Sequence, residues 1–110
     1  MNDVHHYEKK LKWELNRLRE ASFSRQDRVL IAKYAEFLET RGLNKGRFAK
    51  AIYQLRTLRI ELKRDFKKGD KKAIEKLVTW INNRTGYAWT RADARGWLKR
   101  FYRWLKARDQ

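Results

Sequence analysis

Apolar residues recur every three or four positions through five stretches of this chain, and no proline interrupts any of them. This spacing places the apolar side chains on one face of an α-helix, whereas a half-buried strand alternates apolar and polar residues. The chain shows no convincing alternating pattern, no low-complexity segment and no internal repeat. The sequence therefore predicts an all-α fold, a compact bundle of four to five helices.

Capping residues indicate where the helices begin and end. Ser24, Asn44, Asp70 and Thr90 are good N-caps for the second to fifth helices, and Gly42 suits the left-handed end of the second. The predicted helices cover these ranges: 3–21, 24–42, 44–66, 70–83 and 90–105.

The 110 residues are enough for one domain, and a hydrophobic share of 42% is enough for a core. We expect an N-terminal amphipathic helix over 1–23 and a helical domain over 24–110. The apolar stripe of the first helix, from Val4 to Leu18, is narrow. This helix is therefore expected on the rim of the fold or against another protein.

The balance of charge predicts a polyanionic partner, with nucleic acid favoured over an anionic membrane surface. The net charge is +16, from 29 basic and 13 acidic residues. Residues 44–69 contain nine basic and two acidic side chains, and residues 87–110 contain seven basic and two acidic ones. A face that is merely solvated would not need its acids removed from the same two helices, so we favour a binding role.

The charges of these two helices form stripes that turn away from the core. One stripe lies on the third helix and includes Gln54, the residue expected nearest to a base edge. The other lies on the fifth helix opposite Phe101 and continues to Lys106. Free backbone N–H groups are expected at Asn44 and Thr90, where helices begin. The predicted DNA-binding residues are Asn44, Lys45, Arg47, Lys50, Gln54, Thr90, Arg91, Arg95, Lys99 and Arg103.

Gly96 interrupts the fifth helix beside this stripe. A glycine inside a helix costs about 1 kcal/mol relative to alanine, so we expect a compensating contact. Close approach of a partner's backbone and a crowded helix crossing explain it equally well.

Residues for catalysis or cofactor binding are missing from the pattern. The chain has no cysteine, and the adjacent His5 and His6 do not share a helix face, so we expect no metal site. Asp27, Asp70 and Asp93 are explained as helix caps, and no phosphate-binding glycine loop is present. The sequence predicts no active site and no cofactor.

The aromatic residues and the chain's polarity exclude other classes. Most Trp and Phe residues fall on the inward faces of helices, which disfavours stacking on single-stranded nucleic acid. No apolar stretch is long enough to span a membrane, and the N-terminus, with Asp3 and Glu8, is unlike a signal peptide. We expect a soluble, cytoplasmic protein.

Several segments carry a family pattern. They are residues 32–38 with Arg41-Gly42-Leu43, Gly46-Arg47 leading to Tyr53-Gln54-Leu55-Arg56, residues 74–78, Trp89-Thr90 with Asp93, and residues 98–105. Together they resemble the N-terminal core-binding (SAM-like) domain of tyrosine recombinases and phage-type integrases, especially the archaeal branch. The last segment, with its Phe-Tyr-x-Trp-Leu pattern, is the most specific.

The resemblance implies one half of a C-shaped clamp around duplex DNA, with the third and fifth helices at the major groove. It also implies contacts between the first helix and neighbouring protomers. In the family a catalytic domain follows, with its Arg, Lys, His-x-x-Arg and nucleophilic Tyr, and none of it fits after Trp104. We therefore expect a DNA-binding module that does not cut DNA, either a recombinase fragment or a free-standing remnant. Its expected partners are duplex DNA, the missing catalytic domain and neighbouring recombinase protomers.

One alternative from another class stays open. A free-standing basic helical protein would bind DNA without sequence preference, or would bind a protein or membrane partner through the Val4–Leu18 stripe. The apolar faces of the helices match one another, so the membrane partner is the less favoured.

Overall fold

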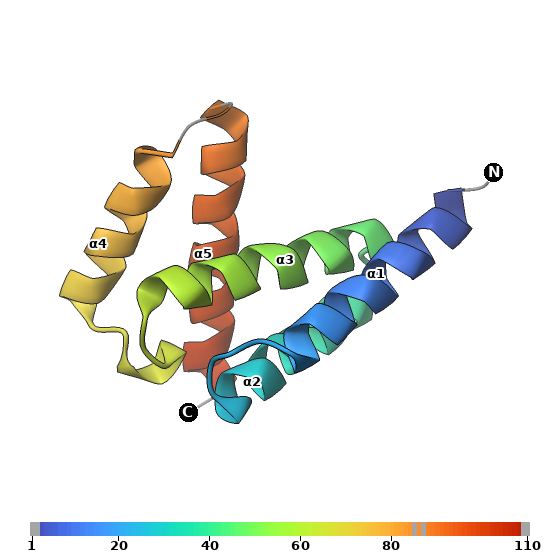
Figure 1. Cartoon of the computed structure of the whole chain (residues 1–110), viewed down its shortest axis with the longest axis horizontal. Helices are drawn as coiled ribbons and strands as arrows, with labels where there is room; N and C mark the ends of the chain where they lie inside the picture. The colour runs from blue at the N-terminus through green and yellow to red at the C-terminus, as the bar shows by residue number, and fades with distance from the viewer. Residues whose placement is uncertain (1–2, 85, 87, 109–110) are drawn as a thin grey trace. The chain divides into compact units, whose positions relative to one another are not determined.

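The computed structural model describes residues 3–84, 86 and 88–108, and all regular elements within them are helices (Figure 1). This confirms the predicted all-α fold with five α-helices in the described residues. They are α1 (Asp3–Arg19), α2 (Arg25–Thr40), α3 (Lys45–Leu62), α4 (Lys71–Asn82) and α5 (Ala88–Arg108), with a short 3-10 helix η1 (Phe66–Lys68) before α4. The side chains of His5, His6 and Trp89 lie outside the part that the structure describes.

The chain divides into two compact units, residues 1–57 and 58–110, and the border falls inside α3. The N-terminal helix, predicted over 1–23 beside a helical domain over 24–110, contacts α2 within the first unit.

The first unit contains α1, α2 and the beginning of α3. Ile31 and Ile52 are fully buried at its core, and Tyr34 is nearly so. Burial of each such side chain stabilises the fold by about 1.5–3 kcal/mol. Ser24 caps α2 as predicted, because its Oγ accepts a hydrogen bond from the Asp27 N–H at 3.3 Å. Gly42 follows α2 with a φ of +78°, the left-handed conformation that the sequence predicts there.

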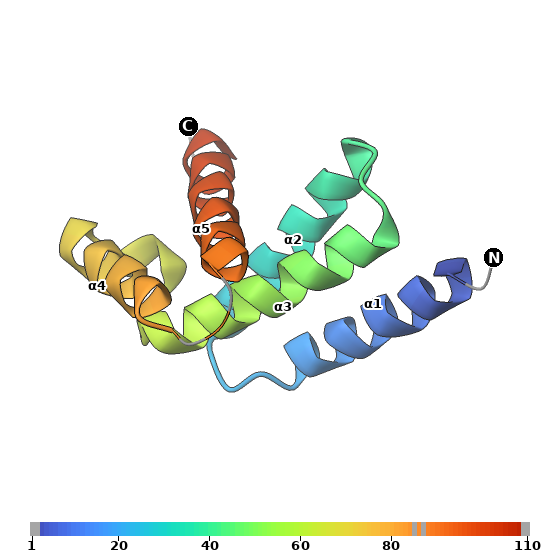
Figure 2. The ribbon, with the colours of Figure 1, turned by 90° about the horizontal axis from the view of Figure 1, so that it is seen from above.

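Two ion pairs hold α1 to the beginning of α3 in this unit, and Figure 2 shows the two helices running alongside one another. Lys45 pairs with Glu8 at 2.6 Å on the surface. Arg56 pairs with Glu14 at 2.9 Å, and both of these side chains are largely buried.

The second unit contains the end of α3, η1, α4 and α5. Phe66 of η1 is fully buried, and its ring centroid lies 4.5 Å from that of Phe101 on α5. Asp70 caps α4 as predicted, because its Oδ1 accepts a hydrogen bond from the Ala73 N–H at 2.8 Å. Figure 1 shows that α4 and α5 converge towards the turn between them.

Several helix limits differ from the prediction by a few residues, and two of these differences have a local cause. α3 ends at Leu62 and not near Phe66, because Lys63 adopts a left-handed conformation with a φ of 62° that turns the chain into η1. α5 begins at Ala88, so Thr90 lies in its first turn and is not its N-cap. Neither Pro nor Gly stands between Ala88 and Thr90 to stop the helix from starting earlier.

Candidate nucleic-acid interface

The basic stripe of α5 lines a groove between α4 and α5. Within the second unit, three predicted residues, Arg95, Lys99 and Arg103, stand along this groove, which has a volume of about 750 Å³. Lys106 continues the stripe, and Lys71 joins it from α4. All five side chains are exposed. The structure therefore brings the second half of the predicted fifth-helix stripe together with a cation from another helix.

The charge of the groove is weakly compensated by its own acids. Asp70 and Glu75 also line it, but the Asp70 carboxylate is engaged as the α4 cap. Within the described residues, no acidic side chain pairs with Lys99, Arg103 or Lys106. The cations thus outnumber the acids and remain available to a ligand.

The floor of the groove is apolar. It is formed by Ile74 and Val78 from α4 and by Leu98 and Tyr102 from α5. The groove therefore combines a cationic rim with a hydrophobic base.

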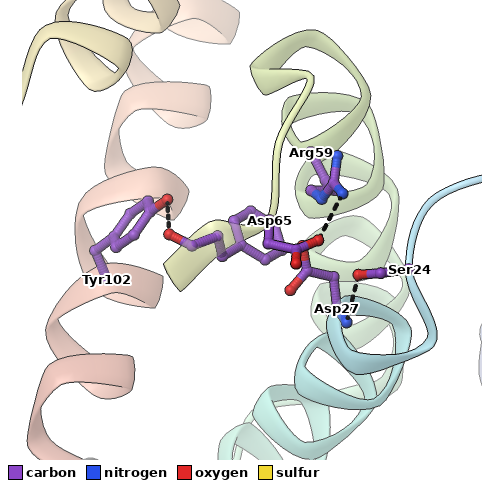
Figure 3. A network of polar contacts seen from close by, with 6 residues as sticks. Ser24, Asp27, Arg59, Asp65 and Tyr102 are labelled. Atoms are coloured by element: carbon purple, nitrogen blue, oxygen red, sulfur yellow. Dashed lines mark hydrogen bonds and ion pairs between the residues drawn. The ribbon is translucent and has the colours of Figure 1, made fainter. Parts of the chain in front are cut away.

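Tyr102 fixes the end of the groove near η1. Its hydroxyl donates a hydrogen bond to the Phe66 carbonyl at 2.8 Å, as Figure 3 shows. Gly69 lies directly beside this bond, and a Cβ at that position would approach the Tyr102 hydroxyl to 2.7 Å. In the same unit Arg59 pairs with Asp65 at 3.1 Å just before η1 (Figure 3). Tyr102 and Gly69 thus form the wall of the groove at this end.

Two arginines at the start of α5 make contacts within the protein. Arg91 donates to the carbonyls of Arg84 at 3.1 Å and Gly86 at 2.9 Å. These contacts anchor Arg91 to residues that follow α4, but both carbonyls are neutral, and its contact with DNA stays a prediction. Arg95 donates to the Asn82 side-chain oxygen at 2.5 Å, but this partner is neutral and leaves the positive charge uncompensated.

The residues of the stripe predicted on α3 differ from one another in exposure and in the contacts that they make within the protein. The Asn44 side chain caps its own helix by accepting a hydrogen bond from the Arg47 N–H at 3.0 Å, so that N–H is not free for a phosphate. Lys45 is engaged with Glu8. The side chains of Arg47 and Lys50 are exposed, as predicted.

Gln54 is wrongly placed by the prediction. Its side chain is only 4% exposed, and its oxygen has no hydrogen-bond partner within the described residues. Gln54 therefore belongs to the interior and does not face a base edge. α3 buries residues on a wide arc that includes Ala49, Ala51 and Arg59, and Gln54 falls within this arc.

At Gly96 the nearest side chain comes from the same helix. A Cβ there would meet the Arg100 guanidinium at 3.0 Å, with no other element among its three nearest atoms. The nearest neighbour of this position is thus a side chain one turn later on the same helix, and close approach of a partner's backbone stays a prediction.

Sequence reasoning missed Lys71 and two exposed rings. Lys71 shares a face of α4 with Ile74 and Val78, at spacings of three and four, so the helical period contained the signal. Trp13 and Tyr53 are exposed, although most aromatic residues point inward.

Among the described residues, no three His, Cys, Asp or Glu side chains are grouped so that they could hold a metal ion. The described residues also contain no helix long and apolar enough to cross a bilayer.

Comparison with known proteins leaves the family resemblance without independent support. No family model, no curated protein and no solved structure matches this chain.

Proposed function

We propose that this chain binds duplex DNA through the groove between α4 and α5. The observation that carries the proposal is the row of exposed cations with few acids beside it. The row from Arg95 to Lys106 extends over about 16 Å of helix. Duplex DNA carries one negative charge per ~1.7 Å of its axis, so such a row meets several phosphates at once.

We further propose that the chain is the DNA-gripping module of a site-specific tyrosine recombinase. The sequence resemblance supports this, and α5 corresponds to one of the helices that the family brings to the major groove. Its partners would be duplex DNA, a separate catalytic domain and neighbouring protomers. The chain itself would bind a supercoiled plasmid without nicking it, since the catalytic Arg, Lys, His-x-x-Arg and Tyr set of the family is missing from its 110 residues.

A charge-matched pair of variants tests DNA binding. The test variant combines Lys99→Gln, Arg103→Gln and Lys106→Gln, and the control combines Lys33→Gln, Lys72→Gln and Lys76→Gln. All six side chains are exposed, and the control residues do not line the groove. We expect the test variant to bind a fluorescent duplex at least about tenfold more weakly in an anisotropy titration, since each neutralised phosphate contact contributes to affinity. The control should stay close to the wild type. Equal losses in both variants would mean that net charge alone, and not this groove, attracts DNA.

The apolar floor favours one other occupant, an acidic amphipathic helix of a partner protein. Such a helix would place leucines on Ile74, Val78 and Leu98 and its acids against the rim. Val78→Lys separates the two functions, because it disrupts the apolar floor and adds a cation. It should leave duplex affinity equal or higher, and it should weaken binding of a Leu/Glu amphipathic peptide.

A further inference from the structure

Two aromatic rings on the first unit are left in solvent. Trp13 on α1 is 52% exposed and Tyr53 on α3 is 44% exposed. All other aromatic side chains that the structure describes are buried or half-buried. Large exposed rings cost solvation free energy, so they are informative about binding.

An arginine stands over each of these rings. The Arg17 guanidinium lies 4.8 Å from the centroid of the Trp13 ring system, and the Arg56 guanidinium lies 5.7 Å from the Tyr53 centroid. Rings and guanidinium planes are the two kinds of flat surface on which nucleic-acid bases stack.

The ion pair between Arg56 and Glu14 connects the two rings. It joins the turn of α3 that carries Tyr53 to the turn of α1 that carries Trp13, the neighbour of Glu14 in the chain. Figure 2 shows the two helices side by side in this unit. The turns that carry the two rings are therefore connected by a largely buried ion pair.

The charge around the rings is positive. Glu14 is buried, and Lys10 and Arg17 on α1 act on it electrostatically together with Arg56. Lys10 and Arg17 are exposed, as is Lys9, which lies four residues before Trp13 on the same helix face. This region thus offers cations for phosphates directly beside the rings.

We propose that this aromatic–basic surface, formed by Lys9, Lys10, Trp13, Arg17 and Tyr53, binds unpaired nucleic acid. Bases stack on Trp13 and Tyr53, the phosphates contact the α1 cations, and Arg56 positions the Tyr53 ring. In a duplex the bases are already stacked on one another, so the rings gain a stacking partner only from a single strand. The surface lies in the first unit and shares no residue with the α4–α5 groove.

Binding of a fluorescent oligo-dT strand of about 15 nucleotides tests this proposal. Trp13→Ala and Tyr53→Ala should each lower its affinity by about tenfold, because each removes one stacking surface. Trp13→Phe and Tyr53→Phe should retain most of the affinity, since a ring remains. Val29→Ala, which shortens an exposed apolar side chain on α2, should have no effect.

Two further arms separate this surface from the groove and from other ligands. The Lys99, Arg103 and Lys106 variant should lose duplex affinity and keep oligo-dT affinity, whereas the ring variants should do the reverse. The proposal is overturned if both alanine variants bind oligo-dT like the wild type. It is also overturned if they lose duplex and single-strand affinity equally, or if a poly-Glu peptide binds this surface as tightly as oligo-dT.

Discussion

Glu14 shows how burial and an ion pair oppose each other at a single residue. Its side chain is nearly inaccessible and receives a hydrogen bond from Arg56 at 2.9 Å. Burial raises the pKa of Glu14 above its ordinary value of 4.5, although Arg56, Arg17 and Lys10 act to lower it. Because its folded pKa lies above its unfolded pKa, the stability that this group contributes is fully present below the unfolded value. That contribution is lost as the pH rises through the folded value.

Glu14→Gln tests whether the stability contributed by this residue falls as the pH rises. The amide oxygen still accepts a hydrogen bond from Arg56, and the cost of burying a charge disappears. We expect the variant to be at least as stable as the wild type at neutral pH, and to show less decline in stability from about pH 4 to about pH 8. Denaturant unfolding followed by circular dichroism measures both. Glu14→Leu serves as the contrast, because it leaves the Arg56 charge unpaired and should cost about 3 kcal/mol. A Gln variant as unstable as the Leu variant would show that the ion pair outweighs the burial cost.

Gln54 offers a second residue-scale prediction. Its buried oxygen lacks a hydrogen-bond partner among the described residues, which costs about 1 kcal/mol or more. Gln54→Met keeps a similar volume and removes the polar group, so it should raise the free energy of unfolding by about 1 kcal/mol. The affinity for duplex DNA should stay unchanged. A loss of affinity for one DNA sequence and not for others would show that Gln54 contacts a base after all.

At the scale of the elements, the end of α3 is set by a strained residue. Lys63 has a φ of 62°, a conformation that costs a residue with a Cβ about 1–2 kcal/mol and glycine almost nothing. Lys63→Gly should therefore stabilise the protein by about 1 kcal/mol in thermal or denaturant unfolding, after the entropy of the unfolded chain is allowed for. A destabilised variant would show that α3 continues past Leu62.

The helices could largely be predicted from the sequence, and the exceptions have physical causes. Ser24 and Asp70 were readable as caps because their short side chains bond their own helix. The sequence predicts Phe66 on α3 because it follows Leu62 by four residues. The break at Lys63 places it in η1, where it is buried all the same. Thr90 has the right chemistry for a cap, but helix propensity alone does not exclude an earlier start.

The candidate site was only half predictable, because a helical wheel assumes one buried face. This assumption holds for α5, where Lys99 and Arg103 are exposed as predicted. It fails for α3, where Gln54 is buried. The internal partners of Arg91 come from the turn before α5, and no periodicity encodes them.

At the scale of the whole molecule, the net charge of +16 makes salt the sharpest probe of binding. The logarithm of duplex affinity should fall linearly with the logarithm of salt concentration, with a slope of about −0.9 per phosphate contact. Neutralising Lys99, Arg103 and Lys106 should therefore make the slope shallower by about 3. Neutralising Lys33, Lys72 and Lys76 should leave the slope unchanged. Equal slopes for the wild type and both variants would show that Lys99, Arg103 and Lys106 do not contact phosphates.

The most direct test of the central claim is to map duplex DNA on the intact chain by NMR. A ¹⁵N-labelled chain of 13.5 kDa is suitable for titration with a short unlabelled duplex. We expect the largest amide shifts in residues 95–106 of α5 and around Lys71 at the start of α4. The amides of α1 and α2 should shift less than those of α5. Shifts confined to α1 and α2, with α5 unchanged, would contradict the claim that the groove between α4 and α5 binds DNA.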